Sequence, residues 1–130
     1  MVGLDGLLNL LISKIEWKLG EKFKEARNFK RDGIIAREAT EHSKAMMWNS
    51  YCDHAPKDYW GSALAELVGR TAASYNDWAI EQAIEGMACD FLVSPRHGPS
   101  LEALPVIGGG IAVRIIGDEI HLYVTLRLKY

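Results

Sequence analysis

The segment that decides the fold runs from residue 111 to residue 129 and reads IAVRIIGDEIHLYVTLRLK. Aliphatic residues recur at every second position along most of it, and this period of two places them on one face of a β-strand. Gly117 and Asp118 interrupt the alternation with residues that favour a tight turn. The segment therefore predicts an antiparallel β-hairpin that packs one face on helices and leaves the other face in water.

Upstream of the hairpin, apolar residues recur three and four positions apart, which is the spacing of an amphipathic helix. A first helix is expected from Leu4 to about residue 30, and a second from about Ile34 to Tyr51. Asp32 and Gly33 form the break between them. Two long helices in the first 51 residues make the N-terminal part of the chain predominantly helical.

The middle of the chain continues this helical spacing after a loop over residues 52–58. A third helix is expected to begin between residues 58 and 62 and to carry Leu64, Leu67 and Val68. A fourth is expected to begin near Asn76. Residues 94–110 are rich in proline and glycine and predict a connection, with a possible short strand at 104–107.

These elements predict one α+β domain over residues 1–130, with about four helices followed by a hairpin, or three strands, packed on them. A length of 130 residues suits a single core. Charged residues make up 25% and hydrophobic residues 48%, which excludes disordered and low-complexity classes. The formal net charge of −2 makes nucleic-acid binding unlikely.

We infer the cellular compartment from the two cysteines and from the sequence of the N-terminus. Cys52 and Cys89 do not make a disulfide framework and suit a reducing environment. The N-terminal apolar run lacks the basic flank of a signal peptide, and no segment is apolar for long enough to span a bilayer. We therefore expect a cytoplasmic protein, with membrane association unlikely.

The predicted hairpin points to a protein partner. A two-stranded ribbon is only marginally stable in water, and its edges present unpaired N–H and C=O groups. Either helices cover the ribbon, or another copy of the chain or another protein pairs with it. We therefore expect a non-enzymatic protein-interaction module, self-associating or acting as an assembly or inhibitor subunit, that needs no cofactor or metal.

A second candidate surface, the aromatic corner, is defined by residues 46–60 and reads MMWNSYCDHAPKDYW. It holds two of the four tryptophans and two of the five tyrosines, the residue types that dominate binding hot spots. The same residues could instead plug a small core. Together with the ribbon, the corner gives these candidate interface residues: Trp48, Tyr51, Tyr59, Trp60, Tyr123 and Arg127.

The alternative is a small metal-dependent or cysteine hydrolase, so that enzymatic activity stays uncertain. Glu38 and His42 are four residues apart and share a helical face, and Cys52 and His54 follow in the loop. However, no HExxH motif and no nucleophile elbow surrounds these four residues. We therefore expect the interaction module in preference to the enzyme.

Basic residues outnumber acidic ones from Lys14 to Lys44, whereas acidic residues predominate from Asp53 to Asp90. The densest basic stretch predicts an electrostatic patch on one helix face, or an ordinary solvated face. Its candidate residues are Lys22, Lys24, Arg27, Lys30 and Arg31.

Two short segments, GLDGLL at residues 3–8 and His54-Ala55-Pro56, resemble small neck or tail-completion proteins of tailed phages. This resemblance implies a virion subunit as a further alternative. The helices expected over residues 62–90 depart from that pattern, and no site residue is carried over from it.

Overall fold

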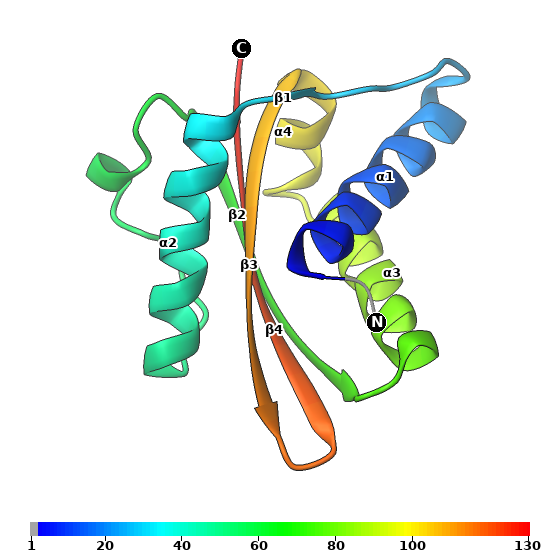
Figure 1. The fold of residues 1–130 in the computed structure, drawn as a ribbon. Coiled ribbons are helices and arrows are strands. Elements are labelled where there is room, and N and C mark those ends of the chain that lie inside the picture. Colours follow the sequence, from blue (N-terminus) through cyan, green and yellow to red (C-terminus); the bar gives the residue numbers. More distant parts are fainter. Residues whose placement is uncertain (1–2) are drawn as a thin grey trace.

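The computed structural model describes residues 3–130 and shows a four-stranded sheet with helices on both of its faces (Figure 1). The strand order across the sheet is β1-β3-β4-β2. The elements in chain order are α1 (Leu4–Phe23), β1 (Lys30–Arg31), α2 (Gly33–Asn49), the 3₁₀ turn η1 (Lys57–Tyr59), β2 (Ala65–Ser74), α3 (Asp77–Val93), α4 (Gly98–Ala103), β3 (Val106–Ile116) and β4 (Glu119–Lys129). The predicted α+β class is confirmed.

The predicted hairpin is formed by β3 and β4. Ile116 pairs with Glu119 across a two-residue turn, and Gly117 opens that turn with a φ of 59°. A glycine with positive φ at this position matches the right-handed twist of the two strands. β1 adds to β3 in parallel, and β2 adds to the other side of β4 in antiparallel.

Helices α1 and α3 cover one face of the sheet, and α2 covers the other (Figure 1). The α1–α3 side holds the main core, in which Leu11, Ile84 and Leu126 have no exposed surface. The opposite face was expected to lie in water, and this expectation is wrong. Tyr123 and Arg127 on that face are each 1% exposed, because α2 and the segment after it pack over them.

Two of three consecutive glycines, Gly108 and Gly110, allow α2 to approach β3 closely. A Cβ atom on Gly110 would lie 2.3 Å from Thr40 Cα, and one on Gly108 would lie 2.5 Å from the Ala36 nitrogen. The buried Ser43 hydroxyl is hydrogen-bonded to the Gly110 carbonyl at 2.9 Å. Any side chain at these positions would push the helix off the strand, so the glycines set the distance between the two layers.

Two expected helices differ from the structure. α1 ends at Phe23 rather than near residue 30, because Lys24 adopts a left-handed conformation with a φ of 60° and turns the chain toward β1. The third expected helix is the strand β2. Leu67, which was assigned to a helical stripe, is fully buried in β2 instead. Pairing along the whole of β4 outweighs the weak helical spacing of this segment.

The expectation of unpaired edges along the ribbon is wrong for β4. β4 lies in the interior of the sheet and is paired on both sides, so it presents no free edge. The expected connection at residues 94–110 contains α4, and β3 already begins at Val106. One free edge of the sheet is that of β2, and beyond Ile107 the outer edge of β3 has no partner strand among residues 3–130.

Candidate functional site: the aromatic corner and the cleft beside β2

A buried ion pair lies beneath the aromatic corner. Glu66 on β2 is 4% exposed and Arg127 on β4 is 1% exposed. Arg127 donates from Nε to Glu66 Oε2 at 2.9 Å, and its terminal nitrogen Nη2 lies 2.9 Å from the same oxygen. Its other terminal nitrogen donates to the Tyr59 carbonyl at 3.1 Å. The pair therefore ties two strands to the loop that carries the corner.

The other oxygen of Glu66 holds that loop directly. Glu66 Oε1 accepts the backbone N–H of Ala55 at 2.9 Å and lies 3.0 Å from His54 Nδ1. Both oxygens of this carboxylate are thus engaged by protein groups. Glu66 is therefore suited to holding the loop and the His54 ring in place rather than to abstracting a proton from a substrate.

His54 connects the buried pair to a second histidine. Its ring centroid lies 5.9 Å from that of His97, which in turn lies 5.8 Å from the Phe91 ring in an edge-on arrangement. Burial lowers the pKa of His97 below its ordinary value of 6.5, and the neighbouring His54 and Arg96 lower it further. A lowered pKa favours an uncharged His97 at neutral pH.

His97 lines the cleft beside β2, a hollow of about 530 Å³ between the edge of β2 and helix α3. This volume is within the range of small-ligand pockets. Gly69 shapes the cleft, since a Cβ there would come 2.9 Å from the Phe91 ring and 3.2 Å from Met87 Cε. The lining residues are Cys52, Val68, Gly69, Arg70, Thr71, Ala83, Gly86, Met87, Asp90, Phe91 and His97.

The aromatic corner contributes both surface and core. Trp48 is 69% exposed and Tyr59 is 71% exposed, whereas Tyr51 is 38% exposed. Trp60 is half-buried and donates from its indole nitrogen to the Ala55 carbonyl at 2.9 Å. Cys52, between these aromatics in sequence, also lines the cleft beside β2. The corner and the cleft are therefore neighbouring parts of one surface.

The two ribbon residues that were expected at an interface lie inside the molecule. Tyr123 is covered on one side by Arg70, whose guanidinium carbon lies 5.0 Å from the ring centroid. Arg127 is held by Glu66 as described above. A partner cannot reach either side chain, so their expected role as interface anchors does not fit the structure.

The structure does not bring together the four residues of the hydrolase alternative. The Glu38 carboxylate lies against Gly61, and His42 Nε2 lies 2.7 Å from the Asp53 carbonyl. Burial raises the pKa of the Cys52 thiol, which disfavours the reactive thiolate. Among residues 3–130, no three His, Cys, Asp or Glu side chains are grouped as a metal site. This arrangement gives the hydrolase alternative no support.

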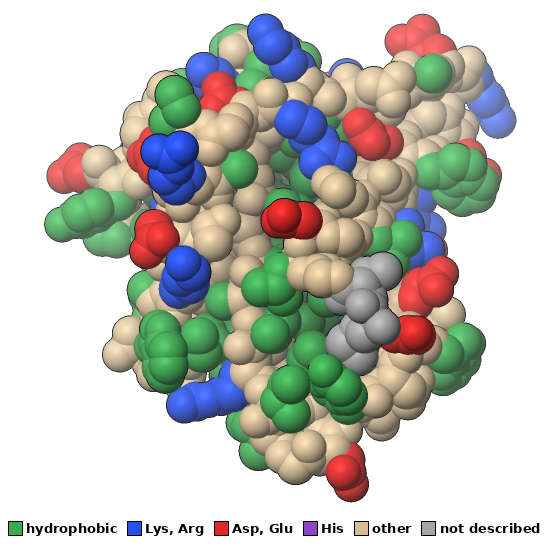
Figure 2. Space-filling model, viewed as in Figure 1, with side chains coloured by type: hydrophobic (Ala, Val, Ile, Leu, Met, Phe, Trp, Pro, Cys, Tyr) green, Lys and Arg blue, Asp and Glu red, His purple; other side chains and the backbone are tan. Residues whose placement is uncertain are grey.

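The predicted basic patch is divided between different surroundings. Lys22 is paired with Glu102, and Arg31 donates to Asn9 at 3.0 Å. Arg27 donates to the Leu101 carbonyl at 3.1 Å. The shared helical face that was expected does not exist, because the helix ends before Lys24. In Figure 2, acidic and basic side chains are interspersed on the visible face.

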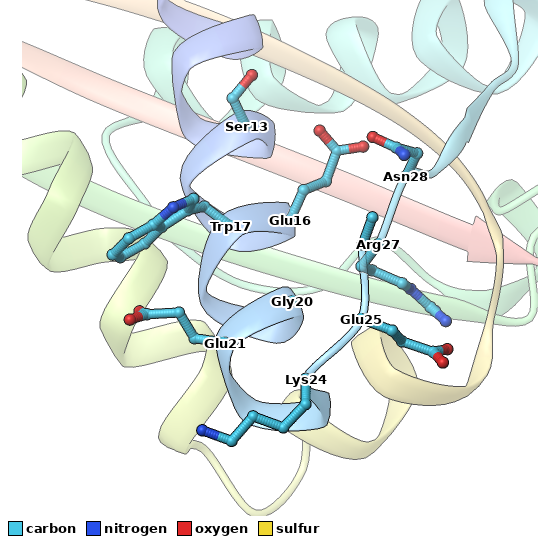
Figure 3. A pocket seen from close by; sticks show the side chains of 10 residues that line it. Ser13, Glu16, Trp17, Gly20, Glu21, Lys24, Glu25, Arg27 and Asn28 are labelled. Carbon is cyan, nitrogen blue, oxygen red and sulfur yellow. The ribbon is translucent and has the colours of Figure 1, made fainter.

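A second hollow, of about 590 Å³, lies between α1 and the segment over residues 24–28 (Figure 3). Trp17, Glu21 and Lys24 lie around it together with Glu25. Glu16, which also lines it, accepts the Phe29 N–H at 2.8 Å and so fixes the returning chain. The charged groups around this hollow are of both signs, which fits a packing gap at the end of α1.

Comparison with known proteins places the fold. No family model matches the chain, and no curated protein sequence matches it significantly. An outer surface protein of Borrelia burgdorferi has a similar structure, with a TM-score of 0.62 at 20% identity over 98% of this chain and 96% of that chain. Venom allergen-like protein 4 of Schistosoma mansoni gives 0.54 at 14% identity, covering 99% and 89%.

An extracellular protein of Bacillus anthracis that contains an SCP domain is similar over 78% of this chain and 34% of its own length, with a TM-score of 0.39 at 22% identity. The first two likenesses show a shared fold. No helix among residues 3–130 is long and apolar enough to cross a membrane. The cytoplasmic location and the resemblance to phage neck proteins both stay predictions.

Two features of this surface were missed by sequence reasoning. Glu66 and Arg127 each interrupt an apolar strand sequence, and a charge in such a position signals a buried pair when its partner lies in a neighbouring strand. The role of His97 has no comparable signal, because its position depends on how the segment after α3 folds back toward the loop over residues 52–58.

Proposed function

We propose that the protein is a non-enzymatic protein-interaction module whose contact surface is centred on the aromatic corner. The observation that carries the proposal is that Trp48 and Tyr59 are each about 70% exposed to solvent. Both side chains have large apolar surfaces. Large aromatics of this kind supply most of the energy of many protein interfaces.

The support beneath the corner fits this role. Glu66, Arg127 and the Trp60 indole hold the loop with four hydrogen bonds, at His54, Ala55 and Tyr59. Of these contacts, the one to His54 fixes a side chain and the others fix backbone groups. A loop held in this way presents its aromatics with little ordering cost on binding, which favours affinity.

The partner is a protein, either a second copy of the chain or an unrelated polypeptide. A small-molecule enzyme is disfavoured because the carboxylate, thiol and imidazole groups near the corner are each engaged separately or poorly ionised. This protein-binding role also accounts for the contiguity of the corner with the cleft beside β2.

Site-specific photocrosslinking tests the proposal in cells that make the protein. A photoreactive phenylalanine replaces Trp48, and the matched control replaces Trp17, which is 64% exposed on α1. We expect a discrete protein adduct from position 48 that is lost when Tyr59→Ala is added, and no such adduct from position 17. Equal adducts from both positions, or none from position 48, would refute the proposal.

A further inference from the structure

The outer edge of β2 carries backbone groups that no other strand takes. β2 is the last strand of the sheet, and among residues 3–130 no backbone hydrogen bond joins its residues 66–73 to anything except β4. Ten residues make it a long edge strand. A long, unprotected edge is a template for pairing with another chain.

The register shows which groups point outward. The Tyr75 N–H donates to the Asp118 carbonyl, and bonded pairs alternate along an antiparallel ladder. Residues 73, 71, 69 and 67 therefore bond to β4, whereas the N–H and C=O groups of Val68, Arg70 and Ala72 point away from it. Arg70 and Ala72 are exposed and Val68 is half-buried, so these groups are within reach of a partner.

We infer that an extended peptide binds in the cleft beside β2 as a fifth strand of the sheet, paired with residues 68–72. The cleft lies along this edge, since Val68, Gly69, Arg70 and Thr71 line it. Strand addition of this kind draws its affinity from backbone hydrogen bonds and its specificity from alternate side chains. The inference rests on the proposed function, for which it names a binding site and a partner chemistry.

The walls of the cleft favour a single strand over the edge of a second folded copy. Cys52 lines it on one side of the sheet, and Met87, Asp90 and Phe91 of α3 line it on the other. A lone extended chain fits between such walls. The β2 edge of a second copy would bring its own α3 and corner segment against them.

The side chains on each wall define the peptide. A residue directly opposite Arg70 places its side chain on the same face of the sheet as Arg70. An acidic residue there pairs with the exposed guanidinium. The residues before and after it face α3, where Met87 and Phe91 present apolar atoms over Gly69. The expected ligand is thus an extended segment with an acidic residue between two apolar ones.

The test uses the full chain and a synthetic peptide, acetyl-Thr-Val-Thr-Leu-Asp-Leu-Thr-Val-Thr-amide. Its control is the same peptide N-methylated at the aspartate and the two threonines nearest to it. In an antiparallel alignment with the aspartate opposite Arg70, this removes the donors that face β2 but keeps every side chain. We expect binding to weaken by about tenfold for each backbone hydrogen bond lost. Replacing the aspartate by lysine should weaken it as well.

Two protein variants and a chemical readout complete the test. Ala72→Pro removes an outward N–H without touching the ladder to β4, and Arg70→Glu reverses the charge. Both should fold, as checked by circular dichroism, and both should bind the peptide more weakly. Bound peptide should slow alkylation of Cys52, which lines the cleft, but not of Cys89, which does not.

The inference is overturned if the N-methylated peptide binds as well as its parent, or if the parent fails to bind and to protect Cys52 at millimolar concentration. Such a failure is distinguishable from failure of the proposed function. A protein adduct at position 48 with no peptide binding would retain the interaction module and discard the strand-addition site. Peptide binding without that adduct would retain the strand-addition site and discard the aromatic corner as the centre of the contact surface.

Discussion

Glu66 and Arg127 are joined by two contacts of 2.9 Å although neither side chain is more than 2% exposed. The two residues face each other across β2 and β4, where Glu66 pairs in register with Arg127. An ion pair taken out of water gains little net energy, but breaking it strands a charge in the interior. The pair therefore specifies how the sheet and the corner loop fit together.

We predict that Glu66→Ala lowers the free energy of unfolding by about 3–5 kcal/mol, because Arg127 would stay buried without its counter-charge. Urea denaturation of wild type and variant measures the difference. The control is Lys44→Ala, which breaks an exposed contact to Glu41 and should change stability by less than about 1 kcal/mol. Equal effects from the two variants would show that the buried pair is not structurally important.

A second prediction concerns two glycines in opposite environments. Gly110→Ala places a methyl group against the α2 backbone and should destabilise the protein by about 1–3 kcal/mol. Gly86→Ala lies in the middle of α3, where the added Cβ meets nothing within 4 Å beyond its chain neighbours and its own helix backbone, and should stabilise the protein by up to about 1 kcal/mol. Thermal unfolding of both variants decides the matter, and effects of the same sign would contradict the packing described here.

The start of α2 gives a prediction in acid. Asp32 accepts the N–H groups of Ile34 and Ile35, each at 2.9 Å, and the bond from Ile35 is the main cause that lowers its pKa below the ordinary 3.8. Because the pKa of Asp32 is lower in the folded than in the unfolded state, its ionised carboxylate stabilises the folded protein above pH 3.8. This stabilisation is lost as the pH falls through the pKa of Asp32 in the folded state. Melting temperatures of Asp32→Asn, which keeps the acceptor but does not titrate, should therefore fall less steeply on acidification.

His97 provides a pH dependence nearer to neutrality. Its pKa is lowered in the folded state, so the unfolded chain takes up the proton more readily as the pH falls below 6.5. Stability should therefore decrease on acidification through this range, and His97→Asn should reduce that decrease. An NMR titration of the ring should place the folded pKa below 6.5, and a higher value would disprove the assignment of burial as its main cause.

Local sequence patterns predicted the elements that are determined mainly by residues close together in the sequence. The two-residue turn and the alternation in β3 and β4 were visible in the sequence, and the start of α3 was predicted near Asn76. The cap there is Asn76 itself, which accepts the Ala79 N–H at 2.9 Å. The glycines before the hairpin were assigned to a connection, whereas Gly108 and Gly110 lie in β3 and make the close contact with α2.

What the sequence could not predict depends on contacts between distant segments. A strand is recognised in a sequence by alternating apolar residues, but β2 has small residues such as Gly69 and Ala73 at the positions that face the core. Its strand conformation therefore depends on pairing with β4. With that strand missing, β4 was expected to have a free edge that β2 in fact covers along its whole length. The aromatic corner stays a prediction as a binding surface, whereas the burial of Tyr123 and Arg127 depends on α2 and the segment after it, which pack over that face of the sheet.

The glycine run under α2 has a consequence for how a partner would be met. At Gly108 and Gly110 no side chain of β3 separates the strand from α2, so the helix lies directly on the backbone of the strand. Trp48, near the end of α2, is therefore placed relative to the sheet by this close contact. A methyl group added at Gly110 would shift α2 relative to the sheet. It would thereby alter the affinity of a surface with which residue 110 itself makes no contact.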